Sequence, residues 1–184
     1  MKQQRGFSLI ELIIVTLIIL IIAGIAIPRF LRARMAANEA SAAGTLKQIG
    51  IANAAYSSVY NIGYAGDLAS LGPPPGGGGC ATVGSTCADL LDSLVSGVSP
   101  AAVNPVKSGY QFTYYAENSP PTLAAPNSTY AVVGVPTAPG GTGTSTFCFD
   151  NKISIIRDTS GGLTSADFSG CAATWPNGAT VSPL

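Results

Sequence analysis

The stretch that decides the fold is the apolar run at residues 7–27, FSLIELIIVTLIILIIAGIAI. Glu11 is its one charged residue. At about 1.5 Å per residue, a helix of this length covers about 31 Å, which matches the hydrocarbon core of a membrane. A core helix of a soluble protein is the competing interpretation, but such helices rarely need a run so long and so rich in Ile and Leu. We therefore predict a membrane-spanning helix.

The flanks of the run argue against a cleaved secretory signal. Lys2 and Arg5 precede it, as such a signal requires, but the run is too long and no small-x-small cleavage site follows it before Pro28. Basic residues lie on both sides of the run, so charge alone does not orient it. The four cysteines of the remaining chain favour an exported C-terminal part, because disulfides form in oxidising compartments.

Glu11 is the unusual residue of this segment. A carboxylate deep in lipid costs roughly 2.5–3.5 kcal/mol on insertion scales. No other side chain of the run can neutralise it, so we expect its partner to come from another chain or from a new N-terminus; the alternative is a tolerated, protonated glutamate without a partner. A cut between Gly6 and Phe7 would create a positive amine on Phe7, about one helical turn from Glu11. Between staggered chains, Glu11 of one is then expected to meet the Phe7 amine of the next.

The residues Arg5-Gly6-Phe7-Ser8-Leu9-Ile10-Glu11 resemble the processing motif of type IV pilins and type II secretion pseudopilins. The resemblance covers about residues 1–60, and the remainder resembles the family only in its layout. It implies that residues 1–6 are a leader, that a prepilin peptidase cuts after Gly6, and that the same enzyme methylates the Phe7 amine. It also implies that Glu11 neutralises a neighbour's amine while a homo-oligomeric helical filament assembles on an inner-membrane platform.

The helix is expected to continue beyond the filament-core segment, residues 7–28. Pro28 removes a backbone hydrogen bond and Gly24 adds freedom, so we expect a bend or a melted turn between them. Residues 29–61 favour helix again, and one apolar face is predicted to pack on a sheet: Leu46, Ile49, Asn53, Tyr56 and Tyr60. Asn61 and Gly63 are predicted to end the helix.

The globular head, residues 62–184, contains four cysteines, Cys80, Cys87, Cys148 and Cys171. No pair has CxxC spacing and the chain has no histidine, which argues against a zinc site. An even number in an exported domain predicts two disulfides, for which three pairings exist. We favour Cys80–Cys87 and Cys148–Cys171 because each pair closes a local loop.

An antiparallel sheet is expected to form the rest of the head. Four segments rich in β-branched or aromatic residues predict strands at 110–116, 129–135, 146–149 and 153–157, with a tight turn at 150–152. Short links between them favour a meander. Residues 88–96 predict a short helix, and residues 158–184 a loop tied back by the second disulfide. The predicted fold is α+β and resembles a pilin: a long N-terminal helix on a four-stranded antiparallel sheet, in a lollipop shape.

The composition favours a structural protein over an enzyme. The net charge is zero, 10% of the residues are charged, and the absence of histidine removes the commonest general base and metal ligand. No nucleophile–base pair, metal cluster or phosphate loop stands out, so a membrane-anchored enzyme is disfavoured. Arg29, Arg32 and Arg34 follow the apolar run and are expected to meet lipid head groups, and no nucleic-acid partner is predicted.

The leading interpretation is a structural subunit of a type IV pilus, held in the inner membrane as a precursor and then carried on the cell surface. The alternative is a major pseudopilin of a type II secretion system, in the periplasm. Major pseudopilins tend to lack a C-terminal disulfide, which favours the pilus.

Calcium is the one cofactor considered. Major pseudopilins resemble this chain and often hold calcium, which makes Asp150, Asn151 and Asp158 candidate oxygen ligands. They do not match an EF-hand loop, and ordinary turn chemistry explains Asp150 and Asn151 equally well. No other cofactor is expected.

Overall fold

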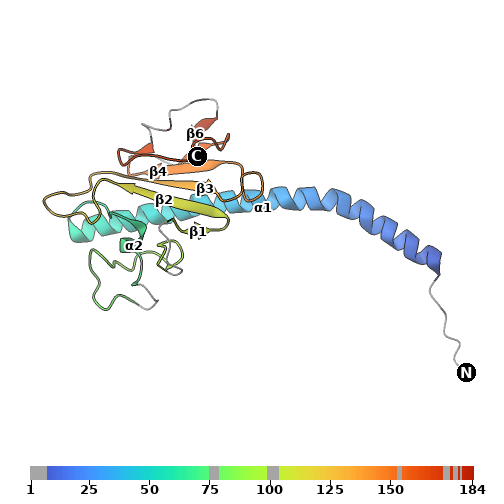
Figure 1. Ribbon diagram of the computed structural model, residues 1–184, viewed down its shortest axis with the longest axis horizontal. Coiled ribbons are helices and arrows are strands. Elements are labelled where there is room, and N and C mark those ends of the chain that lie inside the picture. Colours follow the sequence, from blue (N-terminus) through green and yellow to red (C-terminus); the bar gives the residue numbers. More distant parts are fainter. Residues whose placement is uncertain are drawn as a thin grey trace, which may run out of the picture. The chain divides into compact units, whose positions relative to one another are not determined.

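The computed structural model describes residues 8–74, 79–98, 104–152, 155–171, 175, 178 and 180–184. The chain divides into two compact units, Met1–Arg34 and Met35–Leu184. A single helix, α1 (Leu9–Tyr60), contributes to both of them (Figure 1). It runs through Gly24 and Pro28 without interruption, so the structure contains no melted turn there, and flexibility at these residues stays a prediction.

In the second unit, one face of α1 is buried against the head. The buried positions recur every three or four residues, as expected for a helix that packs on one side: Ala42, Thr45, Leu46, Ile49, Ala52, Asn53 and Tyr56. This confirms the predicted packing face, although Tyr60 is only half-buried. The helix ends where Asn61 and Gly63 adopt positive φ angles of 54° and 79°, as the sequence predicted.

The head is built on one antiparallel sheet in which every strand pairs with the next one along the chain. Its strands are β1 (Val106–Lys107), β2 (Tyr110–Ala116), β3 (Tyr130–Pro136), β4 (Thr146–Asp150), β5 (Ile156–Asp158) and β6 (Val181–Pro183). The α+β class and the antiparallel meander are confirmed, but the predicted count of four strands is wrong. The sheet has six.

The two additional strands are the edge strands. β1 has two residues and β6 has three, which is too short to leave an alternating pattern in the sequence. They form because a neighbour is already in place: Val106 pairs with Gln111 on β2, and Val181 pairs with Asp158 on β5. The prediction of a loop throughout residues 158–184 is therefore wrong at β6. The fourth predicted strand is shifted, since β5 begins at Ile156, while Ile153 lies outside the described residues.

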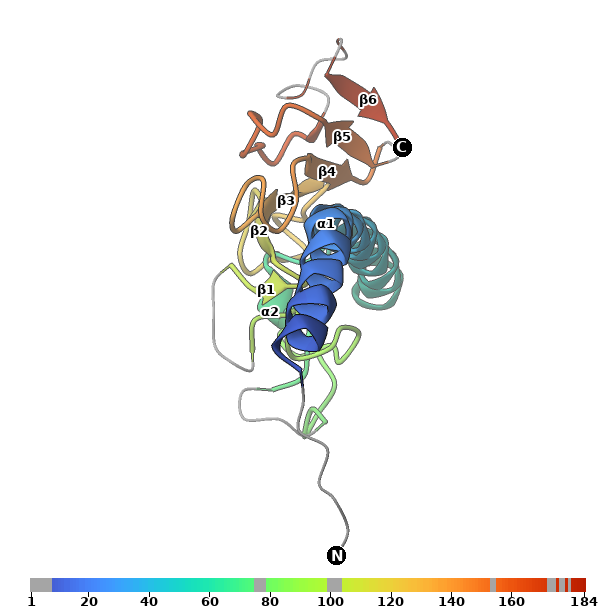
Figure 2. The ribbon, with the colours of Figure 1, turned by 90° about the vertical axis from the view of Figure 1, so that its right-hand side faces the viewer.

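The sheet is covered on both faces (Figure 2). Alternate residues of a strand point to opposite sides. Val132 accordingly packs with Leu46 and other residues of α1, whereas Val133 packs in a second cluster with the Cys148–Cys171 disulfide and Trp175. The indole N–H of Trp175 donates to the carbonyl of Ser165 at 2.8 Å. The segment after β5 thus shields the face that α1 leaves open.

The connection between α1 and the sheet differs most from the prediction. A helix of four residues, α2 (Leu68–Leu71), forms where none was predicted, with Asp67 as its N-cap. No helix forms at residues 88–96. Asp89 has a φ of 54°, and the N–H groups of Ala88 and Leu90 donate to carbonyls at the end of α2 instead. These long-range hydrogen bonds outweigh a weak local helix preference.

Candidate assembly site

The first described residues form one of the two hydrogen bonds of a capping box at the start of α1. Ser8 precedes the helix, and Glu11 is its third residue. The Oε2 atom of Glu11 accepts the backbone N–H of Ser8 at 3.1 Å. Because the first N–H groups of a helix have no acceptor within it, this contact satisfies one of them. The Ser-x-x-Glu pattern is the sequence signal for this role of Ser8, which the sequence analysis did not use.

The hydrogen bond to Ser8 gives Glu11 a polar partner but not the cationic partner that the sequence led us to expect. Sequence reasoning sought its partner in another chain or in a new N-terminus, whereas the structure also provides a partner within the same chain. A neutral N–H group does not cancel the charge of a carboxylate, so a cationic partner is still needed in an apolar setting. Gly6 and Phe7 lie outside the described residues. Cleavage between them and the Phe7 amine contact stay predictions.

The first part of α1 has an apolar surface that the other described residues of its own unit do not cover. Its large hydrophobic side chains from Leu9 to Leu31 are between 50% and 75% exposed. The helix is long and apolar enough to cross a membrane, with a mean hydropathy of 3.1 in its most apolar part. Because apolar surface of this extent is unfavourable in water, the segment requires lipid or other apolar helices around it.

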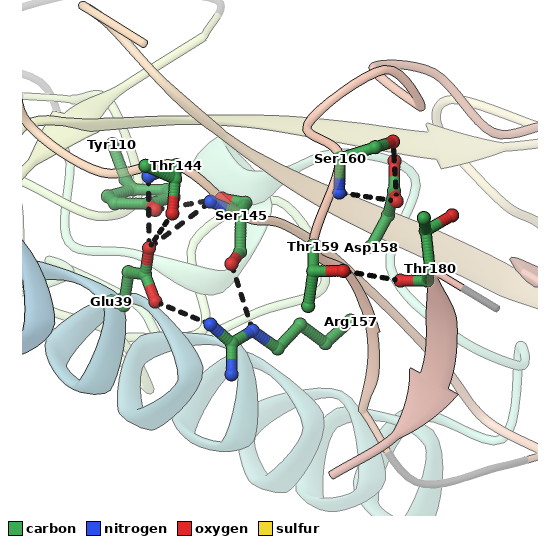
Figure 3. A network of polar contacts seen from close by, with 9 residues as sticks. All are labelled: Glu39, Tyr110, Thr144, Ser145, Arg157, Asp158, Thr159, Ser160 and Thr180. Atoms are coloured by element: carbon green, nitrogen blue, oxygen red, sulfur yellow. Dashed lines mark hydrogen bonds and ion pairs between the residues drawn. The ribbon is translucent and has the colours of Figure 1, made fainter. Parts of the chain in front are cut away.

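Within the head, a polar cluster on Glu39 ties α1 to the sheet (Figure 3). Oε1 of Glu39 accepts the backbone N–H groups of Thr144 and Ser145 at 2.9 and 3.2 Å, and Oε2 forms an ion pair with Arg157 at 3.0 Å. Arg157 in turn donates from Nε to the hydroxyl of Ser145 at 2.9 Å. The cluster therefore joins α1 to the loop before β4 and to β5.

The hydrogen bonds of this cluster set the ionisation of Glu39. Partial burial alone would raise the pKa of Glu39. The N–H groups of Thr144 and Ser145, the Thr144 hydroxyl and the positive charge of Arg157 outweigh this effect, so the pKa lies below its ordinary value. Sequence reasoning missed Glu39 and Arg157 because they are 118 residues apart and no local pattern links them.

Replacing Glu39 by Gln is expected to destabilise the full-length chain in detergent at pH 7 by roughly 2 kcal/mol, because the charged contact to Arg157 is lost. A carboxylate with a lowered folded pKa contributes its stability above the unfolded value of 4.5 and loses it as the pH falls through the folded pKa. The difference between wild type and Glu39→Gln should therefore shrink in acid. Urea unfolding at pH 7 and about pH 3 measures this.

The matched control is Glu117→Gln, since Glu117 is exposed and has no ion pair within the described residues. It should leave stability unchanged at both pH values. A stability difference for Glu39→Gln that is the same at pH 7 and in acid would contradict this account of Glu39.

The disulfides follow the local pairing favoured from the sequence, Cys80 with Cys87 and Cys148 with Cys171. Next to the second one, the carboxylate of Asp150 accepts the backbone N–H of Cys171 at 2.7 Å and that of Lys152 at 2.9 Å. Asp150 thus holds both the turn after β4 and the disulfide-closed segment.

The calcium candidates do not come together at one point. Asp158 pairs with Thr146 on the neighbouring strand β4. Asp150 lies four residues farther along β4, about 13 Å from Thr146. The carboxylate of Asp158 accepts the N–H groups of Ser160, Gly162 and Leu163. In the part of the chain that the structure describes, no three His, Cys, Asp or Glu side chains are grouped to hold a metal ion. Calcium at Asp150, Asn151 or Asp158 stays a prediction.

Residues 1–27 match the family model described as a prokaryotic N-terminal methylation motif. This is the prepilin-type motif of type IV pilins and pseudopilins, which are structural subunits. Together with a long N-terminal helix on an antiparallel sheet, it supports a protein of the type IV pilin or pseudopilin class. The motif implies processing by a prepilin peptidase and assembly into pilus or pseudopilus filaments. No curated protein and no solved structure matches the chain.

Proposed function

We propose that this chain is the structural subunit of a surface pilus, cut between Gly6 and Phe7 and assembled through its N-terminal helix. The observation that carries the proposal is the uncovered apolar surface of α1 from Leu9 to Leu31 behind a prepilin-type motif. The precursor is held in the inner membrane by this surface. In the filament, the same surface is covered by the helices of other copies.

Transfer of α1 from the membrane to the filament depends energetically on Glu11. Burying apolar surface against other helices gains about 25 cal/mol per Å² relative to water, but little relative to lipid. Close packing and polar contacts must therefore favour the filament over the membrane. Pairing the Glu11 carboxylate with the Phe7 amine of a neighbour leaves no net charge in the apolar surrounding and offsets the cost of burying either group alone. The work for extraction comes from the assembly platform.

The closed C-terminal segment favours a pilus over a pseudopilus. Cys148 and Cys171 are both fully buried and close the segment that covers the second face of the sheet. Disulfides form both in the periplasm and at the cell surface, so the tie is compatible with either filament; it favours the pilus because major pseudopilins tend to lack a C-terminal disulfide. The alternative is a major pseudopilin, which has the same processing motif and forms a short periplasmic filament.

Mass spectrometry of sheared surface material from cells that produce the chain tests the proposal. The expected result is an N-terminal peptide that begins at N-methylated Phe7 in the sheared fraction. A processed chain found only in the membrane fraction would replace the pilus by the pseudopilin alternative. A chain that still begins at Met1 would overturn the filament proposal itself.

A further inference from the structure

An apolar groove lies between α1 and the β5–β6 end of the sheet. It has a volume of about 520 Å³ and is lined by Ala40 and Gly44 on the helix and by Phe149, Ile155 and Leu184 on the sheet side. A smaller cavity of about 210 Å³ shares Ala40 and Leu184 with it and continues it towards the Glu39–Arg157 ion pair. The small helix residues leave the groove open, since a Cβ atom added at Gly44 would meet no atom within 4 Å.

An apolar patch lies beside the other edge of the sheet. Its members are Ile51, Leu90, Leu94 and Val106, which are 72%, 41%, 40% and 43% exposed. Ile51 and Leu90 line one cavity with Asp92, and Asp92 binds both the N–H of Leu94 and the Nζ of Lys107 on β1. The patch is tied to β1 through Lys107, whereas Leu184 of the groove directly follows β6, and β1 and β6 are the two edge strands of the sheet (Figure 2). Both surfaces also include residues of α1, where Lys47 of the groove lies one turn from Ile51 of the patch.

The groove has a positive charge at its border, and the patch has a negative charge at its border. Lys47 lines the groove and is exposed, while Asp89 is exposed directly before Leu90 in the patch. Neither side chain forms an ion pair with another of the described residues. A partly exposed apolar surface with an acid beside it can thus meet, in a second copy, an apolar groove with a base beside it.

From this complementarity we infer that successive copies of the chain dock head to head in one direction, with Leu90 and Leu94 of one copy in the groove beside Leu184 of the next and Asp89 paired with Lys47. Two different surfaces on opposite edges of one molecule form a heterologous contact, which repeats without closing and builds an open helical polymer. This inference rests on the proposed function, because it specifies how the heads of the filament meet.

A charge exchange tests the contact in cells that produce the full-length chain. Lys47→Glu and Asp89→Lys should each reduce sheared filaments by about tenfold or more, because each brings like charges together. The combined variant should restore the yield, because the pair is then attractive again with its signs exchanged. Glu117→Lys, which reverses an exposed charge outside both surfaces, is the matched control and should leave the yield unchanged.

The inference is overturned if both single variants assemble as well as Glu117→Lys, or if the combined variant assembles no better than the single ones. Restored filaments in the combined variant uphold it. Asp89 has a positive φ of 54°, which Asn tolerates and Lys tolerates less well, so Asp89→Asn is the variant that removes this charge without straining the backbone, and it should also reduce the filament yield. Thermal unfolding and an intact disulfide pattern on a non-reducing gel check that each variant is folded.

A crosslink separates failure of this contact from failure of the proposed pilus. All four native cysteines are paired, so a chain with Gly44→Cys and Leu94→Cys adds two free thiols. Mild oxidation should convert it into a ladder of multimers on a non-reducing gel, while either substitution alone should give no ladder. A ladder confined to the membrane fraction would support the contact and overturn the surface pilus. Sheared filaments that give no ladder, together with normal yields of both single charge variants, would support the surface pilus and overturn the contact.

Discussion

Filaments are expected to disappear when Glu11 is replaced by Val, while the precursor still inserts in the membrane. The substitution removes the one charge from the apolar run and therefore makes insertion more favourable, by roughly 2.5–3.5 kcal/mol. It also removes the group that we propose attracts the Phe7 amine of a neighbouring copy. Quantifying the chain in sheared and in membrane fractions measures both effects, and a normal filament yield would contradict the role proposed for Glu11.

The hydrogen bond from the N–H of Ser8 to Glu11 supplies a sharper control for this experiment. In Glu11→Gln, the amide oxygen can still accept the N–H of Ser8, so the start of α1 is preserved while the charge is lost. If assembly depends on the charge, Glu11→Gln should fail as Glu11→Val does. If Gln restores filaments and Val does not, the helix start is what matters and the pairing of Glu11 with the Phe7 amine is wrong.

Removing the Cys148–Cys171 disulfide is expected to destabilise the head by roughly 3–4 kcal/mol, a large part of the total stability of a typical domain. The bond spans 23 residues and both sulfur-bearing side chains are fully buried with Trp175 and Val133. Without it, the segment after β5 has fewer restraints and the second face of the sheet loses cover. Thermal unfolding of the full-length Cys148→Ala and Cys171→Ala double variant in detergent measures the loss.

The other disulfide is the matched control for this measurement. Cys80 and Cys87 are seven residues apart and only half-buried, so replacing both by Ala should cost less. The filament yield should follow the same order, because a head with an open second face is degraded before it assembles. A greater loss of stability from the Cys80 and Cys87 variant would show that the covered face of the sheet contributes little.

The sequence by itself determined those features whose physical cause is local. The apolar run needs only its own side chains to predict a helix that avoids water, and Glu11 is conspicuous because nothing around it is polar. The end of α1 at Asn61 follows from a residue that tolerates a positive φ. The three longest strands, β2, β3 and β4, are rich in β-branched and aromatic residues over five to seven positions and were recognisable from that pattern.

Tertiary structure alone decided the features that depend on a distant neighbour. β1 and β6 are strands because β2 and β5 offer them free hydrogen-bonding edges, and residues 88–96 avoid a helix because their N–H groups bond to the end of α2. Glu39 and Arg157 form a cluster only after the sheet has packed on α1. The groove beside Leu184 likewise exists only between the packed elements. Contacts between residues far apart in a chain leave no periodic signal in it, and the free energy that selects them comes from packing.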